Sequence, residues 1–227
     1  GMLPALGIYT QQWVTQANGF LLNFTVALRY SSVDKPDDYS HDLVLKLMDE
    51  YPGVEENVDT TKPINIIVVM NESFSDLTIF DNLEVSQDPT PFLHSLSENT
   101  IKGWMYSPVT GGGTASVEFE YLTGFSTIFQ PPHTVAYQLY TKEGMPSLAS
   151  LFGVNGYETT AFHPYKSSGW NRPIVYNNMR FDNQLYQEDV DNAYLIRNYI
   201  SDQSDYETIF QITDAEPVSY THLTLPT

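Results

Sequence analysis

Thr114 is the residue whose surroundings in this sequence most favour chemistry. It follows Gly111, Gly112 and Gly113 and opens a run that is typical of a helix closed by Gly124. Glycines adopt positive φ angles and let a ligand approach the backbone, and the first turn of a helix attracts phosphate. An alcohol needs activation to act as a nucleophile, and coordination to a divalent cation is one standard means. The structural alternative is that Thr114 is a simple N-cap.

A carboxylate follows the most apolar strand that the sequence predicts. Residues 64–70, INIIVVM, form a continuous run rich in β-branched residues, which indicates a strand buried on both faces of a parallel sheet. Glu72 comes two residues after this strand, and open α/β sheets bind ligands beyond the carboxyl ends of their strands. Glu72 is therefore a candidate metal ligand. Alternatively, Asn71 and Glu72 only stabilise the following turn.

A third group of candidates follows another predicted strand. Residues 162–172, FHPYKSSGWNR, bring together His163, Lys166, Trp170 and Arg172 in a chain that has only 10 Lys and Arg. Arginine presents a fork of donors to phosphate, histidine a donor or metal ligand, and tryptophan a flat surface for a polyol or a lipid headgroup. The alternative is a loop in which the arginine stacks on a half-buried tryptophan.

Apolar runs alternate with turn residues in the order that an α/β domain requires. Strands are predicted at 64–70, 101–107 and 157–163, and helices at 90–99, 114–123 and 146–156, the last with Pro146 in its first turn. The fold class expected from this alternation is α/β with a mainly parallel sheet.

The ends of the sequence differ from this middle part. Residues 1–62 predict a helical stem of two helices, within 19–30 and 41–51, and an acidic linker then leads to a domain at 63–216. Residues 217–227 match neither the acidic character nor the periodicity before them, so we interpret them as a non-native tail. The domain is then expected to stop partway through its sheet, leaving an exposed sheet edge through which chains could self-associate.

The composition excludes several function classes. With 10 Lys and Arg against 28 Asp and Glu, the formal net charge of −18 disfavours nucleic acid as a partner. The absence of cysteine excludes disulfides, thiolate ligands and a cysteine nucleophile. No stretch approaches the roughly 18 apolar residues of a membrane-spanning helix.

Taken together, these motifs resemble the lipoteichoic acid synthase family, which are phosphoglycerol transferases of the alkaline phosphatase and sulfatase superfamily. INIIVVMNESFSD is similar to the first strand of that family with its ESF motif, and GGGTASVEFEYLTG is similar to its nucleophile motif G-x-T-[AS]-x-x-E-F. FHPYKSSGWNR is similar to its H…WNR segment. The resemblance covers roughly residues 18 to 210 and implies an alkaline-phosphatase-like three-layer sandwich.

The resemblance also implies roles for individual residues. Glu72 would be a metal ligand, Thr114 the metal-bound nucleophile, and His163, Trp170 and Arg172 the substrate-headgroup residues. The implied cofactor is a divalent cation, Mn²⁺ first and Mg²⁺ second. The implied reaction moves glycerol phosphate from phosphatidylglycerol to a polyglycerolphosphate or glycan acceptor, at the extracytoplasmic face of a bacterial membrane to which the full-length protein is anchored.

This sequence departs from the family pattern at two places. The family completes its metal site with an Asp-His pair, whereas this chain has no Asp-His dipeptide, and Gly113 stands where the family can have a lysine. We therefore expect the chain by itself to be inactive. Two alternatives remain: another sulfatase or phosphodiesterase of the superfamily, although Ala115, Ser116 and Val117 do not match the sulfatase pattern after the nucleophile, and a non-catalytic module that binds polyol phosphates.

Overall fold

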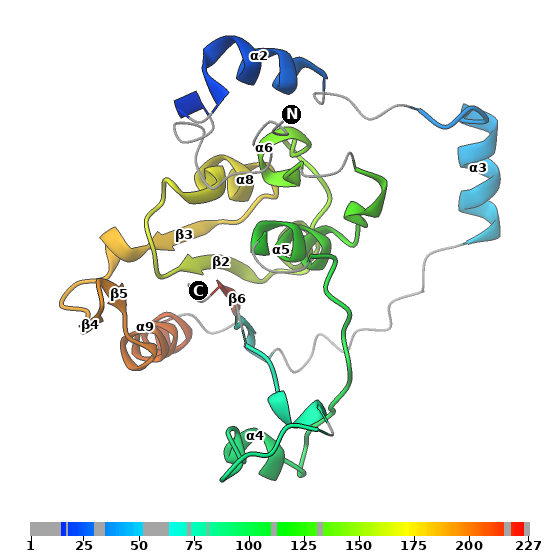
Figure 1. Cartoon of the computed structure of the whole chain (residues 1–227). Coiled ribbons are helices and arrows are strands. Elements are labelled where there is room, and N and C mark those ends of the chain that lie inside the picture. The colour runs from blue at the N-terminus through cyan, green and yellow to red at the C-terminus, as the bar shows by residue number, and fades with distance from the viewer. Residues whose placement is uncertain are drawn as a thin grey trace.

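The fold is taken from a computed structural model (Figure 1). It describes residues 15–16, 18–29, 35–51, 64–71, 74–80, 82–109, 113–130, 134–215 and, for the backbone alone, 219–224. In this part of the chain, the α-helices are α2 (Phe20–Arg29), α3 (His41–Glu50), α4 (Pro91–Ser95), α5 (Thr114–Thr123), α6 (Ala136–Leu139), α7 (Leu148–Val154), α8 (Arg172–Asn178) and α9 (Asp202–Ala215). The single-turn 3-10 helices are η1 (Leu77–Ile79), η2 (Thr127–Phe129), η3 (Gly169–Asn171) and η4 (Gln187–Asp189).

The described sheet has four strands, all parallel, in the order β1-β6-β2-β3. The strands are β1 (Ile66–Met70), β2 (Glu158–His163), β3 (Asn183–Tyr186) and β6 (Ser219–Thr224), and a small hairpin pairs β4 (Leu195–Ile196) with β5 (Tyr199–Ile200). Leu223 of β6 pairs with both Val69 and Phe162, so β1 and β2 end at the same level of the sheet. One strand separates them, which corresponds to about 10 Å.

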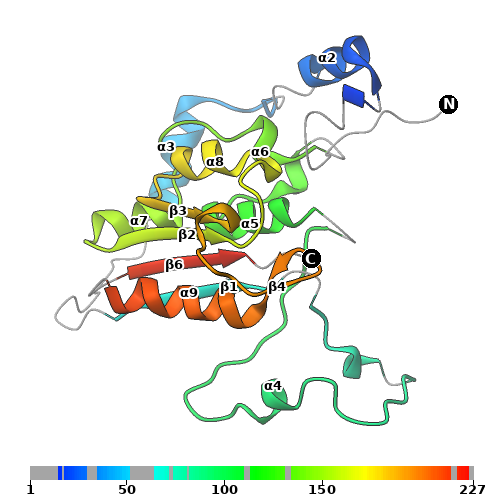
Figure 2. The same cartoon turned by 90° about the vertical axis from the view of Figure 1, so that its left-hand side faces the viewer.

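Helices lie on both faces of this sheet. Helices α5, α6, α7 and α8 gather on one face and α9 lies against the other, under β6 (Figure 2). Parallel strands connected through helices give this arrangement because each crossover returns over a face of the sheet. The three layers agree with the fold class that the sequence predicts.

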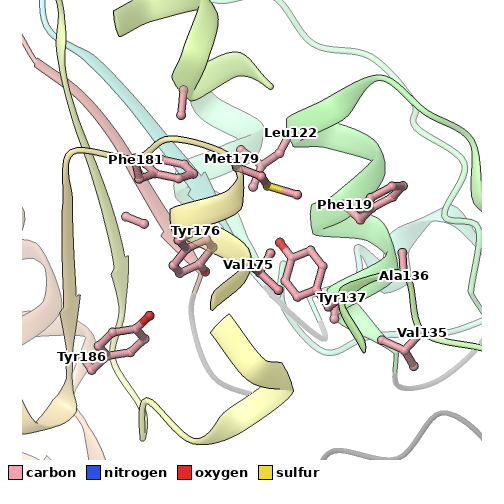
Figure 3. Close-up of a cluster of buried hydrophobic side chains, with 13 residues drawn as sticks. Phe119, Leu122, Val135, Ala136, Tyr137, Val175, Tyr176, Met179, Phe181 and Tyr186 are labelled. Atoms are coloured by element: carbon pink, nitrogen blue, oxygen red, sulfur yellow. The ribbon is translucent and has the colours of Figure 1, made fainter. Parts of the chain in front are cut away.

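The larger part of the core lies between the sheet and helices α5 to α8. Figure 3 shows Phe119 and Leu122 of α5 facing Val175 of α8 and Met179, the residue after this helix, with Tyr137 of α6 between them. All five side chains are buried. A second, smaller cluster forms on the α9 side of the sheet, where Phe162 and Ile209 meet. The core therefore fixes α5 and α8 against one another, and both helices carry predicted site residues.

Local signals explain the ends of the helices on that face. Gly124 ends α5 in the left-handed conformation that glycine tolerates, as the sequence predicts. Ser147 is the N-cap of α7, and it exchanges hydrogen bonds with Ser150 in a capping box. Pro146 therefore precedes the cap, rather than lying in the first turn of the helix as predicted.

The two helices predicted within residues 1–62 are present as α2 and α3. None of the residues of α3 is buried, and the apolar side chains of α2 that are described lie largely in solvent, with Leu21 78% exposed. Among the described residues, no helix combines the length and the apolar character that crossing a bilayer requires.

Residues 74–80 and 82–109 extend away from the sheet, and the helices within these two described ranges are η1 and α4 (Figure 2). The predicted strand at 101–107 is wrong, because this stretch forms no strand and Trp104 is 81% exposed. A run with high β propensity becomes a strand only where another strand can pair with it, and here none does. The helix predicted at 90–99 is shorter than expected, since α4 ends at Ser95.

The prediction that the first strand is buried on both faces is also wrong. Ile66 and Val68 pack against the core on the α5 side, whereas Ile67 and Val69 on the other face are 42% and 37% exposed. Helix α9 contacts β6 on that second face, and it leaves much of β1 uncovered. An apolar run shows that both faces can be covered, but not that the described part of the chain covers them.

The last strand lies inside the described sheet and not at its edge. The backbone of β6 pairs with β1 and β2, so the edges of the described sheet are β1 and β3. The sheet edge that was expected at the last strand of the chain is therefore formed by other strands in the described sheet. The interpretation of residues 217–227 as a non-native tail stays a prediction.

Asp205 is a buried carboxyl group on α9. It is fully buried, neither of its carboxylate oxygens has a hydrogen-bond partner, and it lies one turn before the buried Ile209. Burial, with a smaller contribution from the charge of Asp202, raises the pKa of Asp205 from 3.8 to about 7. The folded state favours the protonated form of Asp205. The contribution of this residue to the free energy of unfolding is therefore greatest below pH 3.8 and falls as the pH rises to about 7.

Asp205→Asn is therefore expected to stabilise the protein at pH 8 by about 1–4 kcal/mol, since one pKa unit corresponds to about 1.4 kcal/mol and the neutral amide does not ionise in the protein interior. At pH 4 the gain should be close to zero, because the carboxyl group is then neutral in the wild type as well. Urea unfolding at the two pH values measures the difference. Asp214→Asn, an exposed change on the same helix, is the matched control, and an equal gain at both pH values would refute the assignment.

Candidate functional site

Thr114 is the first residue of α5, and its N-cap is Gly113. Gly113 has φ 80° and ψ 27°, a left-handed conformation, and a Cβ atom there would lie 3.3 Å from Cγ1 of Val109. Both the left-handed backbone and the close approach of Val109 favour a glycine at this position. The simple N-cap reading of Thr114 is wrong, because no side chain caps this helix end.

Thr114 is half-buried, and it lies at a helix N-terminus. The first backbone N–H groups of a helix have no partners within the helix, and they carry a partial positive charge. Ala115, next in the chain, is fully buried and anchors this end of α5 in the core. An anion placed before α5 would therefore meet a rigid set of donors next to the hydroxyl.

Glu118 lies one turn further along α5 and forms a buried ion pair with Arg172. Nη2 of Arg172 lies 3.0 Å from Oε2 of Glu118, and the two side chains are 1% and 0% exposed. The hydroxyl of Tyr176 donates to Oε1 of Glu118 at 2.5 Å and accepts from Nε of Arg172 at 3.1 Å. We call these three residues the Glu118 network. It joins the first turn of α8 to the second turn of α5.

The phenols in this region stay protonated. Burial, followed by the nearby charge of Glu118, raises the pKa of Tyr176 and of Tyr137 well above the ordinary value of 10.0. Tyr176 is therefore a hydrogen-bond donor at neutral pH, and the negative charge of Glu118 is matched by Arg172 alone among the partners just described.

His163 and Trp170 lie on either side of the loop before α8. His163 is the last residue of β2, so it lies at the carboxyl edge of the sheet, at the level where β1 ends. Its side chain is 3% exposed. Trp170 and Asn171 have φ angles of 56° and 61°. Left-handed residues other than glycine cost about 1 kcal/mol or more each and are concentrated at functional sites.

Arg172 is placed differently from what its predicted role suggests. The side chain predicted to bind the substrate headgroup is almost fully buried and engaged with Glu118 and Tyr176. Thr114 and Glu118 are four residues apart on one helix, so their side chains lie on the same side of α5. Arg172 is therefore bound to the residue of α5 that lies one turn after Thr114.

Glu72, the predicted metal ligand, lies outside the described residues. Glutamate and threonine oxygens are the donor types that Mn²⁺ and Mg²⁺ accept. Within the described ranges, however, no three His, Asp or Glu side chains are grouped so as to hold a metal ion. The described residues by themselves therefore do not form a metal site, and the roles of Glu72 and Thr114 as metal ligands stay predictions.

The sequence reasoning missed Glu118 and Tyr176. Glu118 belongs to the quoted GGGTASVEFEYLTG stretch and lies four residues after the predicted nucleophile, a spacing that puts both side chains on one helix face. The charge balance was a further signal, because the chain has few cations and many carboxylates. A buried arginine needs a carboxylate as its partner, and Glu118 could have been considered for Arg172. Nothing in the sequence singles out Tyr176.

A cavity of about 340 Å³ lies away from these residues, against α9. Its lining includes Leu185, Asp189, Asp191, Glu207 and Gln211. Of the predicted site residues that the structure describes, which are Thr114, His163, Trp170 and Arg172, none borders this cavity.

Comparison with protein families and with known proteins identifies the family to which the chain belongs. The family model described as Sulfatase matches residues 64–219. A protein of Rhizobium meliloti (strain 1021), whose name refers to cyclic beta-1,2-glucan modification, is 35% identical over 216 residues. That match covers 94% of this chain and 32% of the relative, so the chain spans about a third of the relative's length.

Three solved structures share the fold. The phosphoglycerol transferase GacH of Streptococcus pyogenes, in complex with sn-glycerol-1-phosphate, aligns with a TM-score of 0.71 at 23% identity, over 86% of this chain and 54% of that chain. The lipoteichoic acid synthase LtaP of Listeria monocytogenes gives 0.62 at 21% identity, over 89% and 46%. An alkaline phosphatase superfamily protein of Vibrio parahaemolyticus gives 0.57 at 19%, over 73% and 40%. The predicted alkaline-phosphatase-like α/β fold is confirmed.

Proposed function

The chain belongs to the sulfatase family, and from this premise we propose that it is the nucleophile-bearing part of a phosphoglycerol transferase. In this proposal Thr114 is the nucleophile, and His163, Trp170 and Arg172 recognise the glycerol phosphate headgroup. The observation that carries it is the position of Thr114. Its hydroxyl lies at a helix end that is shaped by a left-handed glycine and joined through Glu118 to a buried arginine.

The proposed reaction consists of two displacements at phosphorus. Oγ of Thr114 gives up its proton and forms a bond to the phosphorus of a phosphatidylglycerol headgroup, the bond to the diacylglycerol oxygen breaks, and that oxygen takes up a proton. The acceptor hydroxyl then gives up its proton and forms a bond to the same phosphorus, the bond from phosphorus to Oγ breaks, and Oγ takes up a proton, which restores Thr114. The first turn of α5 and the guanidinium of Arg172 stabilise the negative charge that develops on the phosphate oxygens.

A divalent cation, Mn²⁺ or Mg²⁺, would be held by Glu72 and Thr114, and when bound it would lower the pKa of the threonine hydroxyl. These two ligands are fewer than the roughly six that such ions take, so we propose that the 227-residue chain alone does not turn over. A non-catalytic role in binding polyol phosphates is the alternative that this shortage of ligands favours.

The acceptor is proposed to be a polyglycerolphosphate or a glycan. The name of the 35% identical relative refers to modification of a cyclic glucan, which supports a glycan. We place the reaction at the extracytoplasmic face of a bacterial membrane, with the full-length protein anchored there. Self-association through an edge strand, β1 or β3, remains a proposal.

The test is an NMR titration of the ¹⁵N-labelled chain with sn-glycerol-1-phosphate, with glycerol and with a glycerol sulfate ester. We expect the phosphate ester to shift the backbone signals of Thr114 and Ala115 and the indole signal of Trp170, and glycerol to shift none of them. Tighter binding of the sulfate ester would favour a sulfatase instead. Shifts confined to other parts of the chain would refute the site.

A further inference from the structure

Glu118 and Tyr176 do not face a substrate, yet they hold the residues that the proposed function requires. Both are buried, at 0% exposure each, and both bond to Arg172. We propose that they are positioning residues of the phosphate site, which fix the headgroup turn, residues 169–172, against the first turn of α5. This inference rests on the proposed function.

The contacts constrain the orientation of Arg172 closely. Glu118 binds Nη2 and Tyr176 binds Nε, and these two nitrogens lie along one edge of the planar guanidinium. Two contacts to one edge of a rigid plane set both its position and its tilt. Glu118 is itself rigid, because it lies on α5 between the buried Ser116 and Phe119.

The position of the headgroup turn follows from that of Arg172. Trp170 and Asn171 precede Arg172 directly, and both adopt left-handed conformations that persist only where the surroundings impose them. The Glu118 network is one such constraint, since it attaches the residue after this turn to α5. Trp170 packs against the main core cluster, which limits its movement from the other side.

Two helices are thereby held in one register around the nucleophile. On α5, Glu118 lies one turn after the predicted nucleophile Thr114. On α8, Tyr176 lies one turn after Arg172, the predicted headgroup residue, and both belong to the network. Loss of the network is expected to loosen the headgroup turn relative to Thr114, and the site would then bind phosphate less well while the helices remain formed.

The experiment compares wild type, Glu118→Gln and Tyr176→Phe in the full 227-residue chain. Affinity for sn-glycerol-1-phosphate is measured by NMR titration, and thermal unfolding shows that each variant is folded at the titration temperature. We expect affinity to fall by about tenfold in Glu118→Gln and by about threefold in Tyr176→Phe, as for the loss of a supporting hydrogen bond. The indole signal of Trp170 should broaden in both variants. Glu120→Gln, on the same helix, is the control and should match wild type.

The outcomes separate this inference from the proposed function. Wild-type affinity and a sharp Trp170 signal in both variants, together with weakened binding in Arg172→Lys, would overturn the positioning role and leave the proposed function standing. No binding of the phosphate ester by wild type would overturn both. Should Glu118→Gln not fold, Tyr176→Phe decides alone, because it removes one hydroxyl and keeps the ring in the core.

Discussion

Thr114→Ala is expected to abolish transfer of glycerol phosphate in a catalytically active form of the protein, by about 1,000-fold or more, as for the loss of other enzymatic nucleophiles. The reason is chemical, because alanine has no oxygen that could form a bond to phosphorus. Release of diacylglycerol from phosphatidylglycerol vesicles, measured with Mn²⁺ present, gives the rate.

The same change should hardly affect stability. Thr114 is not the N-cap of α5, and no side chain caps this helix end, so the loss should stay within about 0.5 kcal/mol. Thr123→Ala removes a hydroxyl from the other end of the same helix and should leave the rate unchanged. Comparable rates in wild type and Thr114→Ala would exclude Thr114 as the nucleophile.

The features that the sequence predicted correctly depend on signals within a few residues. Helix α5 with its glycine cap and strand β2 are both present, because caps and apolar periodicity act locally. The motifs that carry the family resemblance are local as well, and the roles that it implies for Thr114, His163 and Trp170 stay predictions. Each of them lies at the end of an element or in the turn that follows one.

The features that the sequence did not predict depend on distant partners. Residues 101–107 have the composition of a strand, but no neighbouring strand in the described part of the chain pairs with them. The contact between Glu118 and Arg172 spans 54 positions, and neither residue alone indicates the other. The scarcity of cations drew attention to the group that contains Arg172, but the burial of Arg172 and its partner depend on the packing of α5 on α8.

The burial of Arg172 changes what its replacement would do to the protein. An arginine on the surface of a site can be replaced at little cost to the fold, whereas a buried one is part of a charge pair. The guanidinium of Arg172 is 1% exposed, and its charge offsets that of Glu118 in the core. A role in binding and a role in stability therefore coincide in one residue, and separating them requires a pair of variants.

Arg172→Met is expected to destabilise the protein by about 3–5 kcal/mol, which is the usual cost of leaving a buried charge without its partner. Methionine fills a similar volume, so the loss reflects the uncompensated carboxylate of Glu118 more than a cavity. Urea unfolding at pH 7 measures it. Arg197→Met, at an exposed position, should change stability by less than about 0.5 kcal/mol.

The double variant Glu118→Leu with Arg172→Met should recover most of this loss, because apolar residues can replace a buried ion pair at little cost. The hydroxyl of Tyr176 then lacks both of its partners, at a cost of about 1–3 kcal/mol. A double variant as unstable as the sum of the two single variants would contradict the pairing. A stable double variant that no longer binds sn-glycerol-1-phosphate would instead show that the pair is retained for the site and not for the fold, since the core accommodates apolar side chains at both positions.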